Sequence, residues 1–168
     1  MKTLADQALA IRPVTPADLA AVRKVLVATW HATYDTILGR EQVEAIMAAW
    51  HSMEGLERQR LVPDSAFLLA EVSGRIVAIA FARPAADDHI VLSQLYVLPE
   101  AQGRGIGRQL LEASLAAFPH ATTVRLEVEP RNVRAVKFYE RVGFRVVDEG
   151  DGCCGLSIRH LVMEKTIA

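Results

Sequence analysis

Residues 95–111 read LYVLPEAQGRGIGRQLL, an apolar run that leads through closely spaced glycines into a helical pattern. The glycines occupy alternate positions in the middle of this run, at Gly103, Gly105 and Gly107. Glycine lets the backbone approach a ligand closely, and a helix that begins there offers unpaired N–H groups and a positive dipole end. Arg104 and Arg108 add guanidinium groups, whose planar donors match phosphate oxygens. The segment therefore predicts a site for a pyrophosphate.

Two well-known phosphate-binding motifs do not match this segment. It lacks the Gly-Lys-Ser/Thr ending of a P-loop, which disfavours Mg-ATP binding by that route. A dinucleotide fold needs G-x-G-x-x-G after the first strand and an acid about twenty residues later. Residues 103–107 instead form G-x-G-x-G, late in the chain. A glycine-bearing turn that only begins a helix stays open as an alternative, because short glycine motifs are weakly specific.

The residues before the glycine segment predict a strand, helices and then three more strands. Residues 9–14 form the first strand, and a helix follows from Pro16 to about Trp30. A second helix surrounds residues 43–50, with a short third helix around 53–61 as its continuation. The three strands cover residues 66–72, 76–83 and 89–98. The last of them is apolar on both faces, which is typical of a central strand.

The residues after the glycine segment predict a helix, a strand, a second helix and a final pair of strands. Residues 122–129 alternate apolar and polar side chains, as a half-buried strand does. Asn132 is a natural N-cap for the next helix, and Gly143 ends that helix. The final strands are 144–148 and 158–165. The predicted order is βααβββαβαββ, a mixed, twisted α/β sheet with helices on both faces.

Composition and charge limit the classes of protein to which this sequence can belong. The chain has 168 residues, 51% of them hydrophobic and 23% charged, which suits a single domain over residues 1–168. The formal net charge of −1 supplies no basic field for nucleic acid or anionic lipid. The first residues lack the apolar run of a signal peptide, and no run approaches the length of a membrane span. We therefore expect a soluble cytoplasmic protein that binds neither nucleic acid nor membrane.

The cysteines and histidines do not indicate a metal site. Cys153 and Cys154 are adjacent, which disfavours an unstrained disulfide, and no second pair completes a zinc site. We expect two reduced thiols there. The histidines show no ligand spacing: His31, His51, His89, His120 and His160.

Two blocks of the sequence resemble the GNAT superfamily of N-acetyltransferases. Gln102, Gly105 and Gly107 fill the acetyl-CoA signature Q/R-x-x-G-x-G/A of that family. The second block resembles the family's L-E-V…N…A…F/L-Y…G-F pattern. Its matching residues are Leu126-Glu127-Val128, Asn132, Ala135, Phe138-Tyr139 and Gly143-Phe144. The resemblance covers about residues 91–147, and the order of elements extends it over nearly the whole chain.

The resemblance implies a GNAT-like fold that uses acetyl-CoA as co-substrate, without a metal. The backbone of Val97 and Leu98 would bind the pantetheine arm as if it were an added strand. Asn132 would also touch the pantetheine, and Tyr139 would lie near the cofactor sulfur. Main-chain N–H groups would bind the pyrophosphate along the glycine segment, which consists of Gln102, Gly103, Arg104, Gly105, Ile106, Gly107 and Arg108.

The expected chemistry is direct attack of a primary amine on the thioester, through a tetrahedral intermediate. The amine must first lose a proton, and the leaving thiolate needs an acid. Tyr139 is the predicted acid, with packing on a helix face as its alternative role. Glu127 is the predicted base, directly or through water, because it matches a glutamate that some members of the family use. A strand-face carboxylate paired with Arg125 or Arg145 is the alternative for Glu127.

The acceptor amine is not identified by the sequence. The variable first half of the chain would build its pocket, around residues 29–50. Two roles stay open for Asp35 and Glu41 in this segment, attraction of a cationic acceptor or only solubility of the surface. Trp30 and Tyr34 are expected as core or rim aromatics. A non-catalytic acyl-CoA-binding regulatory module with the same fold is the alternative function. A homodimer is an expectation from the family alone.

Overall fold

The computed structural model describes residues 8–86, 88–153 and 156–167, and these residues build one seven-stranded sheet. Its strand order is β1-β2-β3-β4-β5-β7-β6, antiparallel except between β4 and β5. The strands are β1 (Leu9–Pro13), β2 (Ala66–Val72), β3 (Arg75–Pro84), β4 (His89–Val97), β5 (Thr123–Val128), β6 (Arg145–Cys153) and β7 (Leu156–Thr166). β4 is the fourth of the seven strands, as its apolar pattern predicts.

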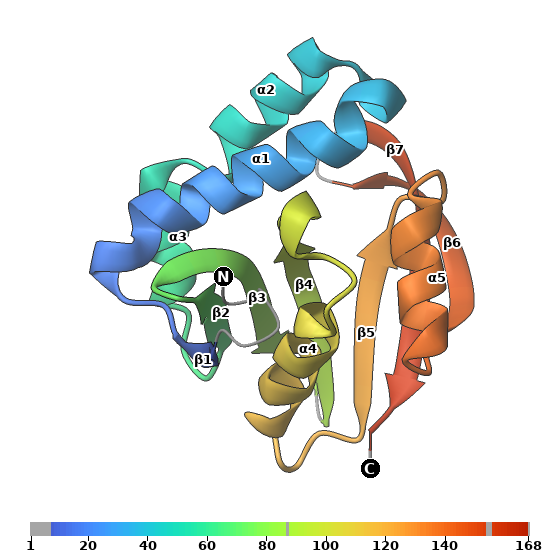
Figure 1. The fold of residues 1–168 in the computed structure, drawn as a ribbon. Coiled ribbons are helices and arrows are strands. Elements are labelled where there is room, and N and C mark those ends of the chain that lie inside the picture. Colours follow the sequence, from blue (N-terminus) through green and yellow to red (C-terminus); the bar gives the residue numbers. More distant parts are fainter. Residues whose placement is uncertain (1–7, 87, 154–155, 168) are drawn as a thin grey trace.

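Within the described residues, five α-helices pack around this sheet (Figure 1). They are α1 (Leu19–Leu38), α2 (Arg40–Trp50), α3 (Met53–Arg60), α4 (Ile106–Ala116) and α5 (Val133–Arg141). The predicted order of elements is confirmed, with α3 as a helix of its own behind the N-cap Ser52. The prediction of two reduced thiols concerns Cys153 and Cys154. Cys154 and the side chain of Cys153 lie outside the part of the chain that is described.

Helix α1 is longer than the prediction, which ended it near Trp30. It continues for two further turns and ends at Leu38, where Gly39 adopts a φ of 88°. That left-handed conformation favours glycine, and the Gly39 N–H closes the last turn on the Asp35 carbonyl at 3.1 Å. The added turns carry Tyr34, whose ring lies 4.5 Å from that of Trp30. Packing of this aromatic pair against the rest of the domain stabilises a segment whose own apolar pattern is weak.

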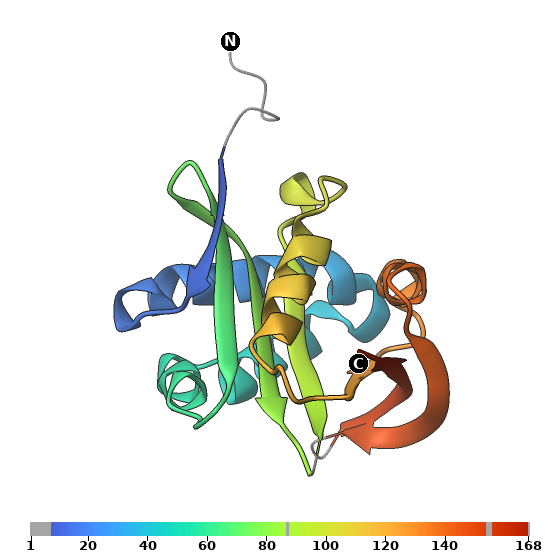
Figure 2. The same ribbon diagram turned by 90° about the horizontal axis from the view of Figure 1, so that it is seen from below.

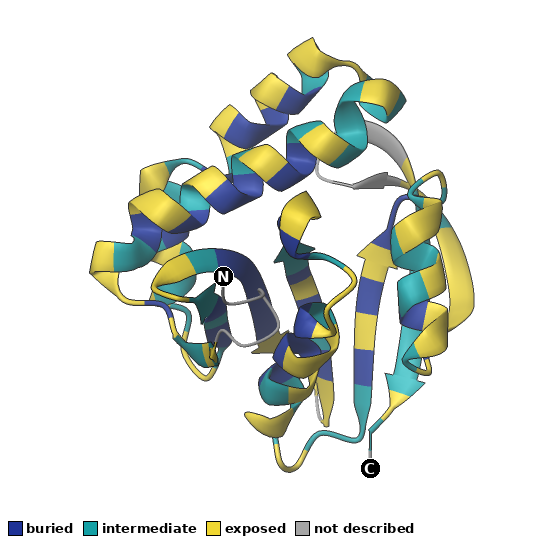
Figure 3. Ribbon diagram, viewed as in Figure 1, coloured by how far each residue is buried: buried dark blue, intermediate teal, exposed yellow. Residues whose placement is uncertain are grey.

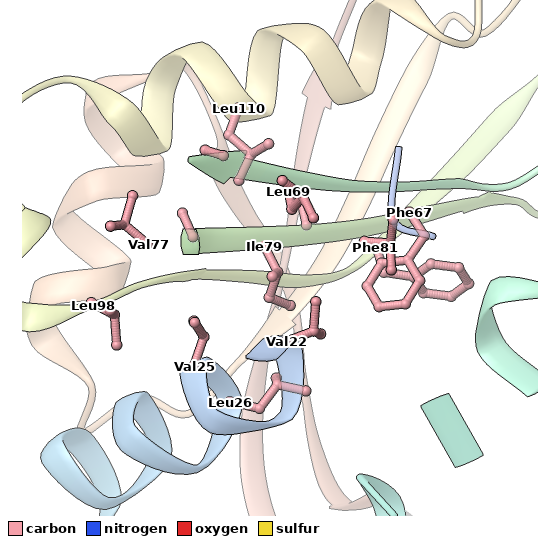
Figure 4. Close-up of a cluster of buried hydrophobic side chains, with 14 of the residues drawn as sticks. Val22, Val25, Leu26, Phe67, Leu69, Val77, Ile79, Phe81, Leu98 and Leu110 are labelled. Atoms are coloured by element: carbon pink, nitrogen blue, oxygen red, sulfur yellow. The ribbon is translucent and has the colours of Figure 1, made fainter. Parts of the chain in front are cut away.

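Helices α1 and α4 cover opposite faces of the sheet (Figure 2). Figure 4 shows Val22 and Leu26 of α1 below the strands, near Ile79 of β3, and Leu110 of α4 above them, near Leu69 of β2. None of these five side chains has measurable solvent exposure. In Figure 3 the burial along β5 alternates, as its sequence predicts. The core of the domain therefore lies on both sides of β2 and β3.

The parallel strands β4 and β5 part from each other soon after they meet. Their pairing covers only His89–Val91 against Thr123–Arg125. Just beyond this point β4 has a register shift against β3, where Phe81 pairs with Gln94 and Ala82 with Leu92. Such irregularities bend a strand and increase its twist. The upper parts of β4 and β5 therefore diverge, as Figure 1 shows.

The loop after α2 holds a buried histidine. His51 is 6% exposed, its carbonyl accepts from Arg23 Nε at 3.0 Å, and its ring lies 6.1 Å from that of Trp30. Its Nδ1 is buried without a hydrogen-bond partner among the described residues. Burial, assisted by the nearby Arg23 cation, lowers the pKa of His51 to about 4. The imidazole is therefore neutral at neutral pH.

This histidine predicts acid sensitivity. Because the folded pKa of about 4 lies below the ordinary value of 6.5, the unfolded chain binds the proton first. The free energy of unfolding should fall as the pH drops from about 6.5 towards 4. Its slope against pH should correspond to the uptake of at most one proton on unfolding. Urea unfolding of the wild type and of His51→Leu between pH 4.5 and 7.5 checks this. Identical pH slopes for the two proteins would contradict it.

Candidate active site

A cavity of about 590 Å³ opens between the diverging parts of β4 and β5. Residues of α1, α2, α4, α5 and β7 complete its walls. Its volume lies within the usual range of ligand pockets. All three tyrosines and both tryptophans of the chain line it: Trp30, Tyr34, Trp50, Tyr96 and Tyr139. Such a concentration of aromatic side chains around one cavity indicates a binding site.

The glycine segment forms the mouth of this cavity at the beginning of α4. Gly103 and Gly105 adopt positive φ values of 78° and 74°. The first hydrogen bond of α4 runs from Gln109 N to the Gly105 carbonyl at 3.0 Å. The N–H groups of Ile106 and Gly107, in the first turn, therefore have no carbonyl of a preceding turn to bind. This geometry leaves main-chain donors available at the beginning of the helix, and their binding of an anion stays a prediction.

Most of the predicted cofactor residues line the cavity. Eight of the ten do so, namely Val97, Gln102, Gly103, Gly105, Ile106, Gly107, Arg108 and Asn132. Gln102 ties the glycine segment to the end of β4, because its Nε2 donates to the Val97 carbonyl at 2.8 Å. Its Oε1 is buried and has no hydrogen-bond partner within the described ranges. Polar atoms so placed are candidates to contact a ligand.

Leu98 and Arg104 lie outside the cavity lining. The Leu98 side chain is 6% exposed in the core, its N–H donates to the Val77 carbonyl, and its own carbonyl accepts from Ala101, both at 2.9 Å. Its backbone groups thus already have partners inside the protein. Arg104 is exposed on the turn between Gly103 and Gly105.

Tyr139 packs in the core and also faces the cavity. Its side chain is 9% exposed, and its ring lies 5.3 Å from Phe138 and 5.4 Å from Phe144. Burial, with a smaller effect of the nearby Tyr34, raises the pKa of Tyr139 well above 10. The phenol therefore stays protonated at neutral pH. The two roles considered for Tyr139, as an acid for the leaving thiolate and as a packed aromatic side chain of the helix, are therefore compatible.

Glu127 also lines the cavity, and its side chain is 53% exposed. Its carboxylate lies 3.9 Å from His160 Nε2. Arg125 pairs instead with Glu164, at 3.0 Å. Among the ion pairs of the described residues Glu127 has no arginine partner, so the structure does not support its alternative role in a pair with Arg125 or Arg145.

A buried carboxylate near Glu127 was missed by the sequence reasoning. Glu129 lines the cavity with a side chain only 5% exposed, and its Oε1 accepts from Arg131 Nε at 2.9 Å. Burial opposes its ionisation, but hydrogen bonds from the side chain and backbone of Arg131 outweigh burial and lower the pKa of Glu129. It is therefore a fixed negative charge. Glu129 lies at the end of a segment in which apolar and polar residues alternate, and that pattern alone does not show that its side chain is buried.

Two hydrogen bonds join the residues after β5 to α1 across the cavity. Arg131 Nη1 donates to the Ile37 carbonyl, and Asn132 Nδ2 donates to the Tyr34 hydroxyl, both at 3.2 Å. Asn132 also N-caps α5 as predicted, because its Oδ1 accepts from Ala135 N at 3.3 Å. The prediction did not anticipate that this side chain would also contact α1. The bridge fixes the end of α1 over the site.

Further charged residues of the lining were not predicted. Arg134 and Arg141 line the cavity from α5, and Arg159 and His160 line it from β7. Arg134 and Arg141 flank Phe138 at spacings of four and three, so they share one face of the helix. That spacing was visible in the sequence, but the face that meets the cavity depends on tertiary packing.

Comparison with known proteins gives a consistent result. The family model described as the acetyltransferase (GNAT) family matches residues 23–144. The mycothiol acetyltransferase of Acidimicrobium ferrooxidans is 36% identical over 118 residues, 61% of this chain and 38% of that protein. The peptidyl-lysine N-acetyltransferase YjaB of Escherichia coli is 37% identical over 60 residues, 36% of this chain and 39% of that protein. The chain thus matches less than half the length of each relative.

A solved structure extends the likeness over nearly the whole chain. The crystal structure of a PaiA N-acetyltransferase from Thermoplasma acidophilum in complex with coenzyme A has a TM-score of 0.85 and 28% sequence identity. The match covers 95% of this chain and 99% of that one. Within the described residues, no helix is long and apolar enough to cross a membrane. The same residues contain no group of three or more His, Cys, Asp or Glu side chains arranged to hold a metal ion.

The backbone geometry of the glycine segment predicts opposite effects at two glycines. Alanine at Gly105 must adopt a φ of 74°, which costs about 1 kcal/mol or more. Alanine at Gly107 meets Val97 and Phe138 at ordinary distances of 3.5 and 3.6 Å and gains helix propensity. We expect urea unfolding to show Gly105→Ala destabilised and Gly107→Ala unchanged or stabilised. The reverse order would contradict the described loop.

Proposed function

The chain belongs to the acetyltransferase (GNAT) family, and from this premise we propose that it transfers the acetyl group of acetyl-CoA to a primary amine. The observation that carries the proposal is the continuity of one cavity. It joins main-chain donors at the beginning of α4 to a buried phenol, Tyr139, and a carboxylate, Glu127. These are the groups that a diphosphate-bearing thioester and an attacking amine require.

The phosphates of the cofactor would bind where α4 begins. Gly103 and residues 105–108 line this part of the cavity, where their N–H groups and the positive end of the helix dipole would bind the phosphates. Arg108, Arg134 and Arg141 line the same cavity, and Arg104 adds a further cation on the exposed turn. We assign Gln102 a positioning role, because it holds this turn against Val97.

The pantetheine arm would lie between β4 and β5. Beyond Val91 the edge of β4 that faces β5 has no strand partner in the described part of the chain. Backbone N–H and C=O groups need partners, and an extended amide chain can supply them as an added strand. Val97 lies at the end of this edge, and Leu98 would contribute only the second lone pair of its carbonyl. Asn132 lies opposite, on the side of α5.

The acceptor amine would lose its proton to Glu127. A lysine-like ammonium titrates near about 10.4 and an α-amine near about 8, so a base must act before attack. Glu127 is half-exposed in the cavity, where it can accept the proton directly or through water. The amine nitrogen then forms its bond to the acetyl carbonyl carbon, and the carbonyl oxygen becomes negative. A main-chain N–H at the end of β4 would stabilise that oxygen.

Collapse of the tetrahedral intermediate breaks the carbon–sulfur bond and leaves a thiolate. Tyr139 faces this region as a protonated phenol. The raised pKa keeps the phenol protonated, and its hydrogen bond to sulfur should strengthen because negative charge develops on the sulfur. The nitrogen of the intermediate gives up its second proton to water, and proton transfer from Tyr139 to the sulfur completes the reaction. Glu127 then releases its proton to solvent and the phenolate recovers one, so that one proton is released overall. The products are the N-acetylated amine and coenzyme A.

The proposal is tested first by acetyl-CoA-dependent thiol release with a panel of amines. We expect CoA to bind by calorimetry and thiol to appear only when an amine is present. Desulfo-CoA, which keeps the phosphates, should inhibit competitively with acetyl-CoA. Binding without thiol release from any amine would instead indicate a regulatory acyl-CoA-binding module. Absence of CoA binding would remove the proposed function altogether.

The two catalytic roles are tested by isosteric substitutions. Tyr139→Phe and Glu127→Gln should each lower kcat by about 100-fold, the usual contribution of a positioned acid or base. KM for acetyl-CoA should change little, because neither side chain holds the phosphates. Glu140→Gln, a substitution on the exposed face of α5, is the matched control and should leave kcat unchanged. Full activity in either test variant would exclude that residue from the mechanism.

A further inference from the structure

The cavity has a net positive charge on the side formed by α4 and α5. Three arginines line it there, Arg108, Arg134 and Arg141. Within the described ranges the ion partner of these three is Glu112, which lies 2.9 Å from Arg108. Three cations and one carboxylate leave an excess of two positive charges. This side suits the phosphates of the cofactor and is unsuited to a cationic acceptor.

The opposite side, formed by the end of β5 and by β7, has a net negative charge. Glu127, Glu129 and Arg159 line it, together with the His160 imidazole. Their charged partners are Arg131, 2.9 Å from Glu129, and Glu149 and Asp151, 3.5 and 3.8 Å from Arg159. Together with these partners, which lie outside the lining, this side carries four carboxylates and two guanidinium groups. Arg131 is hydrogen-bonded to Glu129, and Arg159 lies near two carboxylates of its own.

Aromatic and aliphatic side chains of α1 and α2 form the wall that meets this acidic side. Trp30, Tyr34, Leu38 and Trp50 line the cavity there. The ring of Trp30 lies 4.5 Å from that of Tyr34 and 6.3 Å from that of Trp50, the latter edge-on. Aromatic faces attract ammonium groups and also bury apolar surface. The wall thus accepts an apolar body that ends in a cation.

Glu129 is held where it can meet such a cation. Its side chain is 5% exposed, and Arg131 orients it while also binding the Ile37 carbonyl at the end of α1. Tyr34, which bonds to Asn132 next to Arg131, brings the aromatic wall to the same place. The carboxylate, the ring and the end of α1 are therefore fixed relative to one another. A group so constrained contributes more to selectivity than a mobile surface acid.

We infer that the acceptor, on the premise of the proposed function, is a small alkyl- or arylalkylamine that has no carboxylate beside its amino group, and that Glu129 is the residue that determines this specificity. The ammonium form of the acceptor binds between Glu129 and the ring of Tyr34. Its apolar body packs on Trp30, Leu38 and Trp50. Glu127 then accepts the proton that the ammonium group must lose before the amine attacks, as described above.

An α-amino acid would be disfavoured by charge. Its carboxylate would enter the acidic side, close to Glu127 and Glu129. Repulsion between like charges about 6 Å apart, at a relative permittivity of about 20, would weaken the binding of the amino acid by about 100-fold. Screening by salt and water reduces this to about 10-fold. The discrimination should therefore be easily measurable.

Three related amines separate the effect of charge from that of size. Phenethylamine has no substituent beside its amino group, phenylalanine has a carboxylate there, and phenylalaninamide has a neutral group of similar size. With wild-type enzyme and acetyl-CoA, we expect kcat/KM for phenethylamine and phenylalaninamide to exceed that for phenylalanine by about 10-fold or more. Similar rejection of both substituted amines would show that size decides, which would overturn the inference.

A substitution at Glu129 tests its part in this selectivity. Glu129→Gln keeps the shape and the acceptor oxygen for Arg131 but removes the charge. We expect KM for phenethylamine to rise by about 10-fold, with kcat nearly unchanged, and the preference over phenylalanine to shrink towards unity. Glu140→Gln, which removes an exposed carboxylate of α5 outside the cavity lining, is the matched control and should preserve the preference. Thermal unfolding checks that both variants are folded.

The outcomes distinguish this inference from the proposed function. Acetyl transfer to phenylalanine as fast as to phenethylamine would overturn the acceptor class and leave the acetyltransferase activity intact. Transfer to none of the three amines, with CoA still bound, would also overturn the acceptor class. A Glu129→Gln variant that lowers kcat alone, with KM and the preference unchanged, would remove Glu129 from acceptor recognition.

Discussion

The separation of β4 from β5 after three residue pairs is the constraint on which the site depends. Two parallel strands at the centre of a sheet would ordinarily remain paired, because each pair satisfies backbone donors and acceptors. Here the register shift in β4 bends the strand away, and the side chains of Tyr96 and Tyr139 occupy the walls of the opening. The sheet thereby contains an edge at its centre, and a ligand with amide groups can complete it.

The opening also explains why one cavity serves two chemically different molecules. The loop that leaves β4 leads into α4 and presents main-chain donors, whereas the end of β5 and the loop after it present the carboxylates of Glu127 and Glu129. Because both loops lie at the same end of the diverging strands, phosphates and an ammonium group can be held on opposite sides of one reacting centre. Residues 127–132 contribute most to the second side, since Glu127, Glu129 and Asn132 all line the cavity.

Local features were readable from the sequence, and features set by packing were not. The glycine segment was identified because positive φ values and an open helix start depend on neighbouring residues alone. Glu127 and Tyr139 were found by resemblance to the family, and the structure places both in the cavity without testing their roles. Glu129 was missed because its burial depends on Arg131 and the end of α1. That end was itself predicted too early, since the packing of Tyr34 on Trp30 is a tertiary contact.

A crystal structure with coenzyme A bound tests the central claim most directly. The account predicts that the pantetheine arm lies between β4 and β5 and hydrogen-bonds to the free edge of β4, with the pyrophosphate on the N–H groups at the beginning of α4. Coenzyme A bound elsewhere, or β4 and β5 paired along their full length in its presence, would contradict the account.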